Sequence, residues 1–322
     1  MHLLTLGGTG FLSTAVVTAA VERGHDVLAL SRGRTGTTPP GARAVHADRD
    51  DEQALRAAVE GLPTAPDAVV DVCGYSVAGA RAAASVLGDV SAYAYVSSIS
   101  AYRDWPPGPV ADESAPTFPS TADLEDYGPM KAESERVLSA ALPDRVLHAR
   151  AGLIVGPGDR TRRMTTWLHR FATQERVAVP DDLDRPIAVV DVRDLGGWLV
   201  EAVERGLCGP VNATGDRGMT TYGGLLEACR AAVAAEGGTP GEMVVVSEDE
   251  LVDAGVRPWA DLPFWMPAET AATGWHVGTA RARELGLPSR PVAETVRDAW
   301  RWVLESGFTH PEQPESLRRW EA

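Results

Sequence analysis

Lysine is almost absent from this chain. Of the 30 basic residues among 322, a single one is lysine, Lys131, and the rest are arginine. Such a bias is typical of a G/C-rich coding sequence, so a position that keeps lysine against it indicates a need for an ammonium rather than a guanidinium. Residue 131 is therefore the first candidate for a functional side chain.

Basic charge, cysteine and long apolar segments are also scarce. The net charge of −15 argues against nucleic acid or an anionic membrane surface as the partner, because both attract basic proteins. No segment approaches the roughly 20 apolar residues of a membrane span, and glycines interrupt the start of the chain where a signal peptide would continue. The three cysteines form no CxxC pair, which predicts neither a zinc site nor a disulfide framework. We expect a cytoplasmic protein without a metal.

Short apolar segments alternate with helical patterns in the first half of the chain. Strands are predicted at residues 3–6, 27–30, 42–47, 68–72, 93–97 and 146–149, and helices at 11–23, 51–60, 77–87 and 127–141. This alternation is typical of βαβ units, so we predict an α/β fold with a Rossmann-type doubly wound parallel sheet. Residues 98–125 are rich in proline and are predicted to form a long loop.

The second half is less regular. Helices are predicted at residues 161–173, 192–205, 222–235 and 291–305, and a strand at 187–190. We assign residues 1–156 to a dinucleotide-binding domain, to which 186–215 return. Residues 157–185 and 216–322 are assigned to a smaller, mixed C-terminal substrate lobe.

Three glycines, at positions 7, 8 and 10, separate the first predicted strand from the first helix. Glycine permits a tight turn and lets the backbone approach a pyrophosphate at the helix N-terminus, where free N–H groups and the helix dipole favour negative charge. The strand before and the helix after are the context that a dinucleotide-binding turn requires. The residues expected to contact the dinucleotide here are Gly7, Thr9, Gly10, Phe11 and Leu12.

The end of the second strand distinguishes between cofactors. An acidic residue there binds a ribose hydroxyl, whereas an arginine accepts a 2′-phosphate. This chain has Ser31, Arg32 and Arg34 and no carboxylate in that turn. We therefore predict NADP(H), with contacts from Ser31 and Arg32; NAD(H) stays open. Asp48, after the third strand, is assigned to the adenine edge.

Lys131 stands four residues after Tyr127, one turn along a predicted helix. Asp126 is the predicted N-cap of that helix, and Pro129 falls in its first turn. A free phenol has a pKa near 10, and a nearby ammonium lowers it, so that Tyr127 exchanges protons with a substrate oxygen. A serine of the Ser97-Ser98 pair, at the end of a predicted strand, supplies a hydroxyl to hold that oxygen.

With these motifs in order, the chain resembles an extended, or atypical extended, short-chain dehydrogenase/reductase of the NAD-dependent epimerase/dehydratase group. The likeness rests on residues 7–13, 96–102, 127–131 and 150–157. The family serine usually precedes a second tyrosine by four residues, and Ser98 and Tyr102 have that spacing. The resemblance implies that Ser98, Tyr127 and Lys131 are catalytic. It also implies that Tyr127 and Lys131 contact the cofactor, with Lys131 at the nicotinamide ribose.

The chain departs from the family pattern at three places, which bear on helix packing, reaction type and substrate. Ser13 replaces the third glycine of the turn, which is expected to loosen helix–strand packing. Ile99-Ser100 stand where dehydratases carry Asp-Glu, which argues against elimination chemistry. Leu153 occupies the position of a substrate-contacting asparagine in sugar-nucleotide epimerases, which favours a smaller, more apolar substrate.

A group of large apolar residues lies in the C-terminal third: Trp259, Phe264, Trp265, Met266 and Trp275. It is interpreted either as an apolar wall for a ligand or as a packing core.

The function predicted from the sequence is an NADP(H)-dependent oxidoreductase, a ketoreductase or alcohol dehydrogenase, acting on a small or secondary-metabolite carbonyl or alcohol. Epimerisation by transient oxidation uses the same serine, tyrosine and lysine and stays open, as does a non-catalytic NAD(P)-binding redox sensor. The net charge argues against an RNA-binding relative. The expected partner is a small-molecule substrate, and a homodimer is left open.

Overall fold

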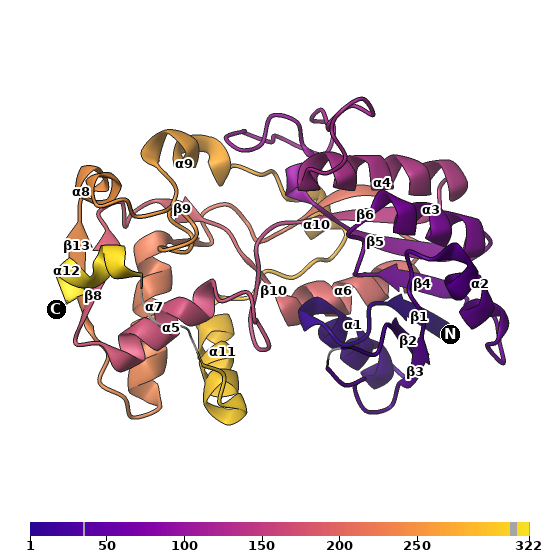
Figure 1. Cartoon of the computed structure of the whole chain (residues 1–322), viewed down its shortest axis with the longest axis horizontal. Helices are drawn as coiled ribbons and strands as arrows, with labels where there is room; N and C mark the ends of the chain where they lie inside the picture. Colours follow the sequence, from indigo (N-terminus) through magenta and orange to yellow (C-terminus); the bar gives the residue numbers. More distant parts are fainter. Residues whose placement is uncertain (35, 310–313, 322) are drawn as a thin grey trace. The chain divides into compact units, whose positions relative to one another are not determined.

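The apolar segments of the first half form one parallel sheet. Seven strands are hydrogen-bonded in the order β11-β6-β5-β4-β1-β2-β3, and each neighbouring pair runs parallel (Figure 1). They are β1 (His2–Leu6), β2 (Asp26–Ser31), β3 (Arg43–His46), β4 (Ala68–Asp71), β5 (Ala92–Ser98), β6 (Val146–Ala151) and β11 (Gly209–Ala213). The predicted Rossmann-type doubly wound sheet is confirmed, with β11 as a strand that the sequence pattern did not indicate.

Helices cover both faces of this sheet. Figure 1 shows α3 and α4 on one side and α1 and α6 on the other, and each of these two pairs is in contact. The helices around the sheet are α1 (Phe11–Glu22), α2 (Glu52–Glu60), α3 (Val77–Val86), α4 (Tyr127–Ala141), α6 (Val192–Glu204) and α10 (Ala280–Glu284). α6 approaches α1 closely at Gly196, where a Cβ would lie 3.0 Å from Ala15. Glycine at this point therefore sets the distance between the two helices.

The carboxyl ends of the strands meet along one edge, because all seven run in the same direction. Leu6, at the end of β1, is in register with Leu30 of β2 on one side and with Asp71 of β4 on the other. The strand order reverses at β1, and open α/β sheets bind their ligands at such a point. The segments that follow β1, β2, β4 and β5 are therefore placed at a common edge.

The computed structural model describes residues 1–34, 36–309 and 314–321. Two compact units are distinguished. The first, which contains the sheet, comprises Met1–Ile154, Val192–Thr214 and Val277–Pro288; the second comprises Val155–Asp191, Gly215–His276 and Ser289–Ala322. The roles assigned from the sequence to the two parts, dinucleotide binding and substrate binding, stay predictions.

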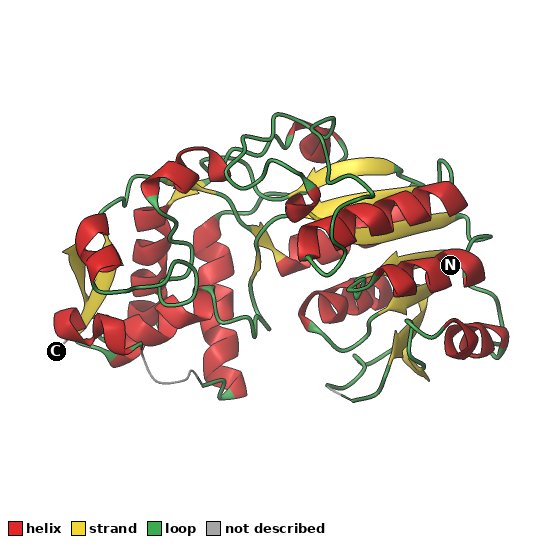
Figure 2. Cartoon of the chain, turned by 45° about the horizontal axis from the view of Figure 1, so that its top comes forward, coloured by secondary structure: helices red, strands yellow, loops and turns green. Residues whose placement is uncertain are grey.

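Three helices form the centre of the second unit, where α7 packs against both α5 and α11. Its helices, shown in red in Figure 2, are α5 (Met164–Thr173), α7 (Tyr222–Ala235), α8 (Glu248–Asp253), α9 (Ala268–Gly274), α11 (Val292–Ser306) and α12 (Arg318–Glu321). Strand β8 (Arg176–Pro180) pairs in parallel with β13 (Glu242–Val246). Between α5 and α7 the ring of Trp167 lies edge-on to Tyr222, with centroids 6.0 Å apart, so aromatic packing joins these helices.

Two elements of the second half differ from the sequence prediction. The helix expected at residues 161–173 begins only at Met164, because Arg162 has a φ of 65°, which is outside the helical region. The strand expected at 187–190 is instead two short strands, β9 (Pro186–Ile187) and β10 (Val190–Asp191). They are separate because β9 pairs with β12 (Thr220–Thr221), whereas β10 pairs with β7 (Ile154–Val155).

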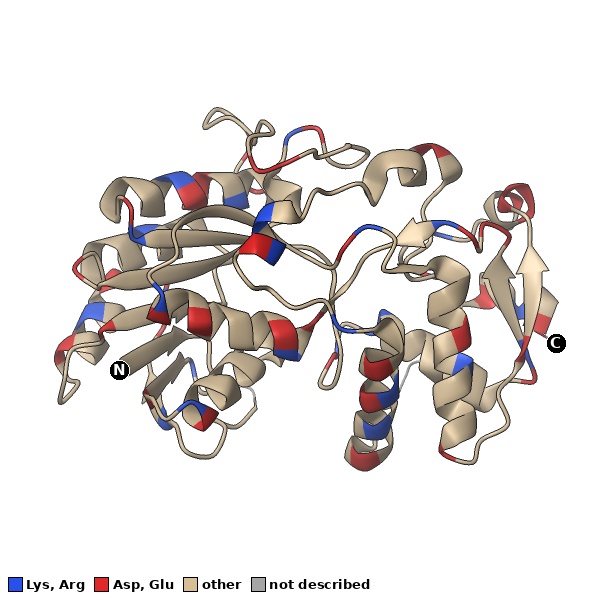
Figure 3. Cartoon of the chain, turned by 180° about the vertical axis from the view of Figure 1, so that it is seen from behind, with Lys and Arg blue, Asp and Glu red and all other residues tan. Residues whose placement is uncertain are grey.

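Charged residues of both signs occur along the helices and loops of both units (Figure 3). Within residues 1–34, 36–309 and 314–321, no helix has the length and apolar character needed to cross a membrane. Over the same residues, no group of His, Cys, Asp and Glu is arranged to hold a metal ion.

Candidate active site

The glycine turn joins β1 to the N-terminus of α1. Gly7 has a φ of 97°, a conformation that glycine adopts without strain. A Cβ on Gly8 would lie 2.8 Å from the Cβ of Ala29 in β2, so a side chain there would push the turn away from the sheet. The turn is therefore shaped by glycine at both positions, and it leaves the first amides of α1, which have no partner within the helix, pointing out of its end.

Ser13, which replaces the third glycine of the family pattern, caps the helix. Its Oγ accepts a hydrogen bond from Gly10 N at 2.8 Å and donates to Gly10 O at 3.2 Å. The side chain is 4% exposed, so it is accommodated between the turn and the helix. The hydroxyl therefore ties the turn to the first turn of the helix, and the looser helix–strand packing expected at this position stays a prediction.

The residues predicted to select the cofactor follow β2 and β3. Arg32 and Arg34 are exposed after β2, and Ser31 Oγ accepts a hydrogen bond from Gly33 N at 3.3 Å. Asp48 is half-buried after β3, and its Oδ1 accepts a hydrogen bond from Asp50 N at 3.1 Å. Gly7 N donates to the carbonyl of Leu30, so the end of β2 lies directly beside the glycine turn.

The two serines at the end of β5 have different roles. Ser97 donates a hydrogen bond to Glu135 Oε1 at 2.5 Å, and Arg150 of β6 binds the same carboxylate with Nη2 at 2.7 Å from Oε2. Ser98 Oγ accepts a hydrogen bond from Ser100 N at 3.1 Å, which leaves its own hydrogen for another acceptor. Ser97 is thus a structural residue, and Ser98 is the serine whose hydroxyl can donate to a ligand.

Helix α4 begins at Tyr127, as predicted. Asp126 occupies the N-cap position, but its side chain makes no capping hydrogen bond; the carboxylate expected to cap the helix does not do so. A Cβ on Gly128 would lie 2.3 Å from the carbonyl oxygen of Ser100, so glycine is required for the first turn to lie against the segment after β5. This contact brings the start of α4 to the end of β5.

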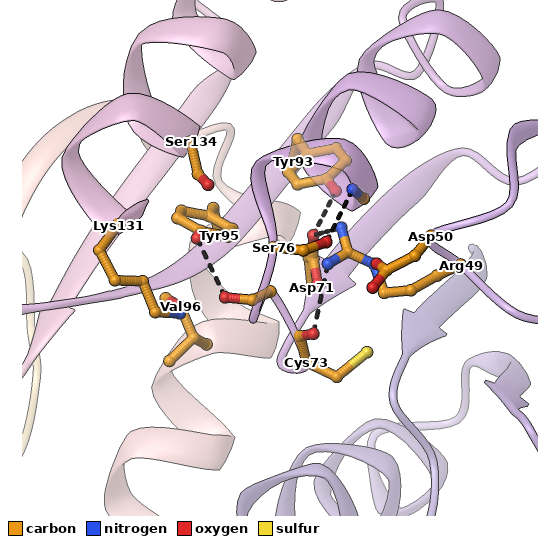
Figure 4. Close-up of polar contacts among 12 residues, drawn as sticks. Arg49, Asp50, Asp71, Cys73, Ser76, Tyr93, Tyr95, Val96, Lys131 and Ser134 are labelled. Atoms are coloured by element: carbon orange, nitrogen blue, oxygen red, sulfur yellow. Dashed lines mark hydrogen bonds and ion pairs between the residues drawn. The ribbon is translucent and has the colours of Figure 1, made fainter. Parts of the chain in front are cut away.

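Lys131 lies almost entirely inside the protein, with 2% of its surface exposed, whereas Tyr127 is 47% exposed. Lys131 Nζ donates a hydrogen bond to the carbonyl oxygen of Val96 at 2.8 Å, two residues before Ser98 (Figure 4). Its distance to the ring centroid of Tyr127 is 5.6 Å. The structure therefore places Tyr127, Lys131 and the end of β5 together.

Two more tyrosine rings surround the ammonium. Lys131 Nζ lies 4.9 Å from the ring centroid of Tyr95 and 5.3 Å from that of Tyr75. Burial lowers the pKa of Lys131 to about 8; the negative charge of Asp71 opposes this shift and the positive charge of Arg49 adds to it. The ammonium is thus held by a carbonyl and by aromatic faces rather than by a carboxylate in direct contact.

A buried polar network next to this site was not anticipated from the sequence. Arg49 Nη2 donates to Asp71 Oδ2 at 2.7 Å, and the hydroxyl of Tyr93 donates to the same oxygen at 2.8 Å (Figure 4). Arg49 Nη1 also donates to the carbonyl of Cys73 at 3.2 Å. Desolvation raises the pKa of Tyr93 well above its ordinary value, so its hydroxyl stays protonated and keeps donating. The network fixes the chain where it leaves β4.

The C-terminal aromatic group lies in the second unit and is mostly buried. Phe264, Trp265, Met266 and Trp275 are each less than 10% exposed, and Trp259 lies 6.0 Å from both Phe264 and Trp275 between ring centroids. These contacts are those of a packing core, the second of the two interpretations.

Comparisons with known proteins show which family this chain is similar to. A model described as the NAD dependent epimerase/dehydratase family matches residues 3–86. A search of curated proteins found no match.

Solved structures share the fold over nearly the whole chain. WbmH from Bordetella bronchiseptica, in complex with NAD+, is 17% identical with a TM-score of 0.70, covering 95% of this chain and 99% of that one. A putative epimerase from Burkholderia cenocepacia is 21% identical with a TM-score of 0.70, covering 93% and 96%. UDP-glucose 4-epimerase from Thermotoga maritima, with UDP-glucose, is 17% identical with a TM-score of 0.70, covering 96% and 100%.

At such low identities the structural matches establish a common fold and no more. The match to residues 3–86 adds the family's own sequence pattern around the glycine turn. The predicted resemblance to the NAD-dependent epimerase/dehydratase family is thereby confirmed over residues 3–86, and the shared fold over nearly the whole chain.

Proposed function

We propose that this protein binds a nicotinamide dinucleotide and transfers hydride between it and a substrate carbon that carries a hydroxyl or carbonyl oxygen. The observation that carries the proposal is an exposed phenol, Tyr127, beside a buried ammonium, Lys131, with the Ser98 hydroxyl at the end of the neighbouring strand. A phenol, an ammonium and a hydroxyl on neighbouring elements suit proton transfer to or from such an oxygen.

The residues at the glycine turn fit a dinucleotide. The turn has no side chain at Gly7, Gly8 or Gly10, and α1 has no acidic residue in its first turn, so a pyrophosphate can approach the free amides of Phe11 and Leu12. Thr9 completes this turn. The exposed Arg32, with Ser31, would hold a 2′-phosphate, and Asp48 would bind the adenine edge.

The bound cofactor would supply the hydride donor or acceptor, and the protein would supply the groups that transfer the proton and position the substrate oxygen. Tyr127 would give a proton to the substrate oxygen during reduction and take it back during oxidation. Lys131 would favour the phenolate of Tyr127 electrostatically and hold the ribose hydroxyls of the nicotinamide half. Ser98 would donate a hydrogen bond to the same oxygen and fix its position.

Epimerisation by transient oxidation is a second candidate. The UDP-glucose 4-epimerase of Thermotoga maritima covers 96% of this chain with its fold, and that reaction would use the same three side chains. Leu153, at the position of a substrate-contacting asparagine in sugar-nucleotide epimerases, favours a more apolar substrate over a nucleotide sugar. A non-catalytic redox sensor has no need of a phenol beside an ammonium, so this pair does not favour that function.

One assay separates these functions. The protein is incubated with NADPH or NADH and a panel of ketones, and with NADP+ or NAD+ and panels of secondary alcohols and UDP-sugars. Nicotinamide absorbance and the stereochemistry of the products are followed. A reductase consumes the cofactor, whereas an epimerase inverts a centre without net consumption. Binding of neither NADPH nor NADH would refute the proposal.

Arg32→Ala is expected to weaken NADPH binding by roughly 10- to 100-fold, because it removes a charge-assisted contact to the 2′-phosphate. Binding of NADH should change little, so the preference for NADPH falls. Dissociation constants from nicotinamide fluorescence give both values. Arg81→Ala, which removes an exposed arginine from α3, is the matched control. An unchanged preference would place the phosphate contact elsewhere.

The two serines provide another comparison. Ser98→Ala should lower turnover by about 10²- to 10³-fold through loss of the donor to the substrate oxygen. Ser97→Ala should instead cost about 1–3 kcal/mol of stability, since Glu135 loses a buried hydrogen bond, with a smaller effect on turnover. Denaturant unfolding and turnover measured on both variants check this; the reverse pattern would make Ser97 the catalytic serine.

A further inference from the structure

Lys131 carries a buried positive charge that needs a negative charge in its surroundings. An ammonium that is taken out of water tends to lose its proton unless an opposite charge compensates it. Two buried carboxylates act on Lys131, Asp71 at the end of β4 and Glu135 on α4, which are 0% and 6% exposed. Each is a candidate for the counter-charge.

Glu135 is already paired at both of its oxygens. Arg150 binds it as a fork, with Nε 3.0 Å from Oε1 and Nη2 2.7 Å from Oε2. Ser97 also donates to Oε1, at 2.5 Å. The charge of this carboxylate is therefore balanced by a guanidinium in direct, two-point contact.

Asp71 is held at one oxygen only. Arg49 Nη2 and the hydroxyl of Tyr93 both donate to Oδ2, whereas Oδ1 is buried and has no hydrogen-bond partner among the residues that the structure describes. Arg49 contributes a single nitrogen to this contact, while its Nη1 donates to the carbonyl of Cys73. The negative charge of Asp71 is thus less completely compensated than that of Glu135.

Asp71 and Lys131 have Tyr95 as a common neighbour. Asp71 is in register with Tyr95 on the next strand of the parallel sheet, so the two side chains leave the same face. The ring centroid of Tyr95 lies 4.9 Å from Lys131 Nζ (Figure 4). Because charges inside a protein are weakly screened, a carboxylate next to this ring acts on the ammonium without touching it.

The groups around Lys131 act in opposite directions on its pKa. Burial is the largest influence and lowers the pKa to about 8; the charge of Asp71 comes next and raises it, and the charge of Arg49 lowers it. The other titratable groups that face the ammonium belong to the turn after β4, to β5 and to α4: Cys73, Tyr75, Tyr95, Tyr127 and Glu135. Asp71 is therefore the charge that most strongly opposes the effect of burial.

We infer that Asp71 is a positioning residue of the proposed active site, whose carboxylate is the counter-charge that keeps the buried Lys131 protonated at neutral pH. This inference rests on the proposed function, in which an ammonium favours the phenolate of Tyr127 and holds the ribose hydroxyls. Arg49 and Tyr93 hold the carboxylate in place, and its charge acts on Lys131 from beside Tyr95.

The test uses the fact that the chain has a single lysine. Lysine labelled with 13C at Cε gives one NMR signal from this protein, and its chemical shift against pH gives the pKa of Lys131 without any substrate. The proteins are the wild type, Asp71→Asn, the double variant Arg49→Met with Asp71→Asn, and Glu60→Gln. The double variant removes both charges of the buried pair, and Glu60→Gln removes an exposed carboxylate from α2 as a control.

The wild type should titrate near pH 8. Asp71→Asn should lower the midpoint by at least about one pH unit, a tenfold loss of proton affinity, because the positive charge of Arg49 stays behind. The double variant should lower it by less, since Asp71 outweighs Arg49, and Glu60→Gln should leave it unchanged. A midpoint that is unchanged or higher in Asp71→Asn or in the double variant would overturn the inference. If Asp71→Asn does not fold, the double variant decides, because it leaves neither charge of the pair buried alone.

Turnover is then measured against pH with a substrate that the wild type accepts. The loss of turnover on the alkaline side should move to lower pH together with the NMR midpoint. A turnover profile that stays in place while the midpoint moves would overturn the role of the Lys131 charge in the proposed function, and with it the positioning role of Asp71. An NMR midpoint that stays in place would overturn the inference and leave the proposed function intact.

Discussion

Tyr127→Phe is expected to lower the rate of hydride transfer by roughly 10²- to 10⁴-fold, the usual contribution of a positioned acid or base. The substitution removes only a hydroxyl from a half-exposed ring, so the folded structure should be unaffected. Binding of NADPH or NADH should change little, because the proposed cofactor contacts lie mainly at the glycine turn, the end of β2 and Lys131.

The measurement is a single-turnover reaction followed by nicotinamide absorbance, with whichever carbonyl or alcohol the wild-type protein accepts. Tyr222→Phe is a matched control in the second unit, where the hydroxyl donates only to the carbonyl of Pro263. Unchanged turnover in Tyr127→Phe would remove this residue from the chemistry.

Lys131→Met is expected to abolish turnover and, at the same time, to make the protein more stable at pH 7. Burial lowers the pKa of Lys131 from 10.5 to about 8, so the ammonium is less favourable in the folded state than in the unfolded one. One pKa unit corresponds to about 1.4 kcal/mol. Allowing for the lost hydrogen bond to Val96, the expected gain is roughly 1–3 kcal/mol.

The pH dependence of this gain has a defined sign. Because the folded pKa lies below the unfolded one, the wild type bears the full penalty below pH 8, and the penalty disappears as pH rises from about 8 towards 10.5. The stability difference between Lys131→Met and the wild type should therefore be largest at pH 7 and shrink between pH 8 and 10. Denaturant unfolding at several pH values measures it. If Lys131→Met were less stable at pH 7, the ammonium would have to be a stabilising group.

The first half of the fold could be predicted from the sequence because its signals are local. Most strands are short apolar segments, β1, β3 and β4 are each followed within a few residues by a turn and a helix, and the glycines mark where β1 meets α1. β11 was missed because its five residues begin with Gly209 and Pro210, which weaken the strand pattern. The pairing of β8 with β13 was also missed, since it joins segments more than sixty residues apart, for which no local pattern exists.

The residues of the proposed active site that belong to a sequence motif could be predicted. The residues that are recognised only by their burial could not. Tyr127, Lys131 and Ser98 were found from spacing and order. Asp71 and Glu135 were not, because a carboxylate in a sequence is usually a surface residue. Only the folded structure shows that each is buried and paired with an arginine, Arg49 and Arg150 respectively.

The carboxylate of Glu135 connects three elements that carry or flank the proposed catalytic residues. It lies on α4, one turn after Lys131, and binds Ser97 of β5 and Arg150 of β6. These contacts hold α4, β5 and β6 together as one rigid unit. The distance between Ser98 and Lys131 is therefore kept when the surrounding residues change. A new substrate preference can then evolve by changing peripheral loops, without any need to rebuild the chemistry at the centre.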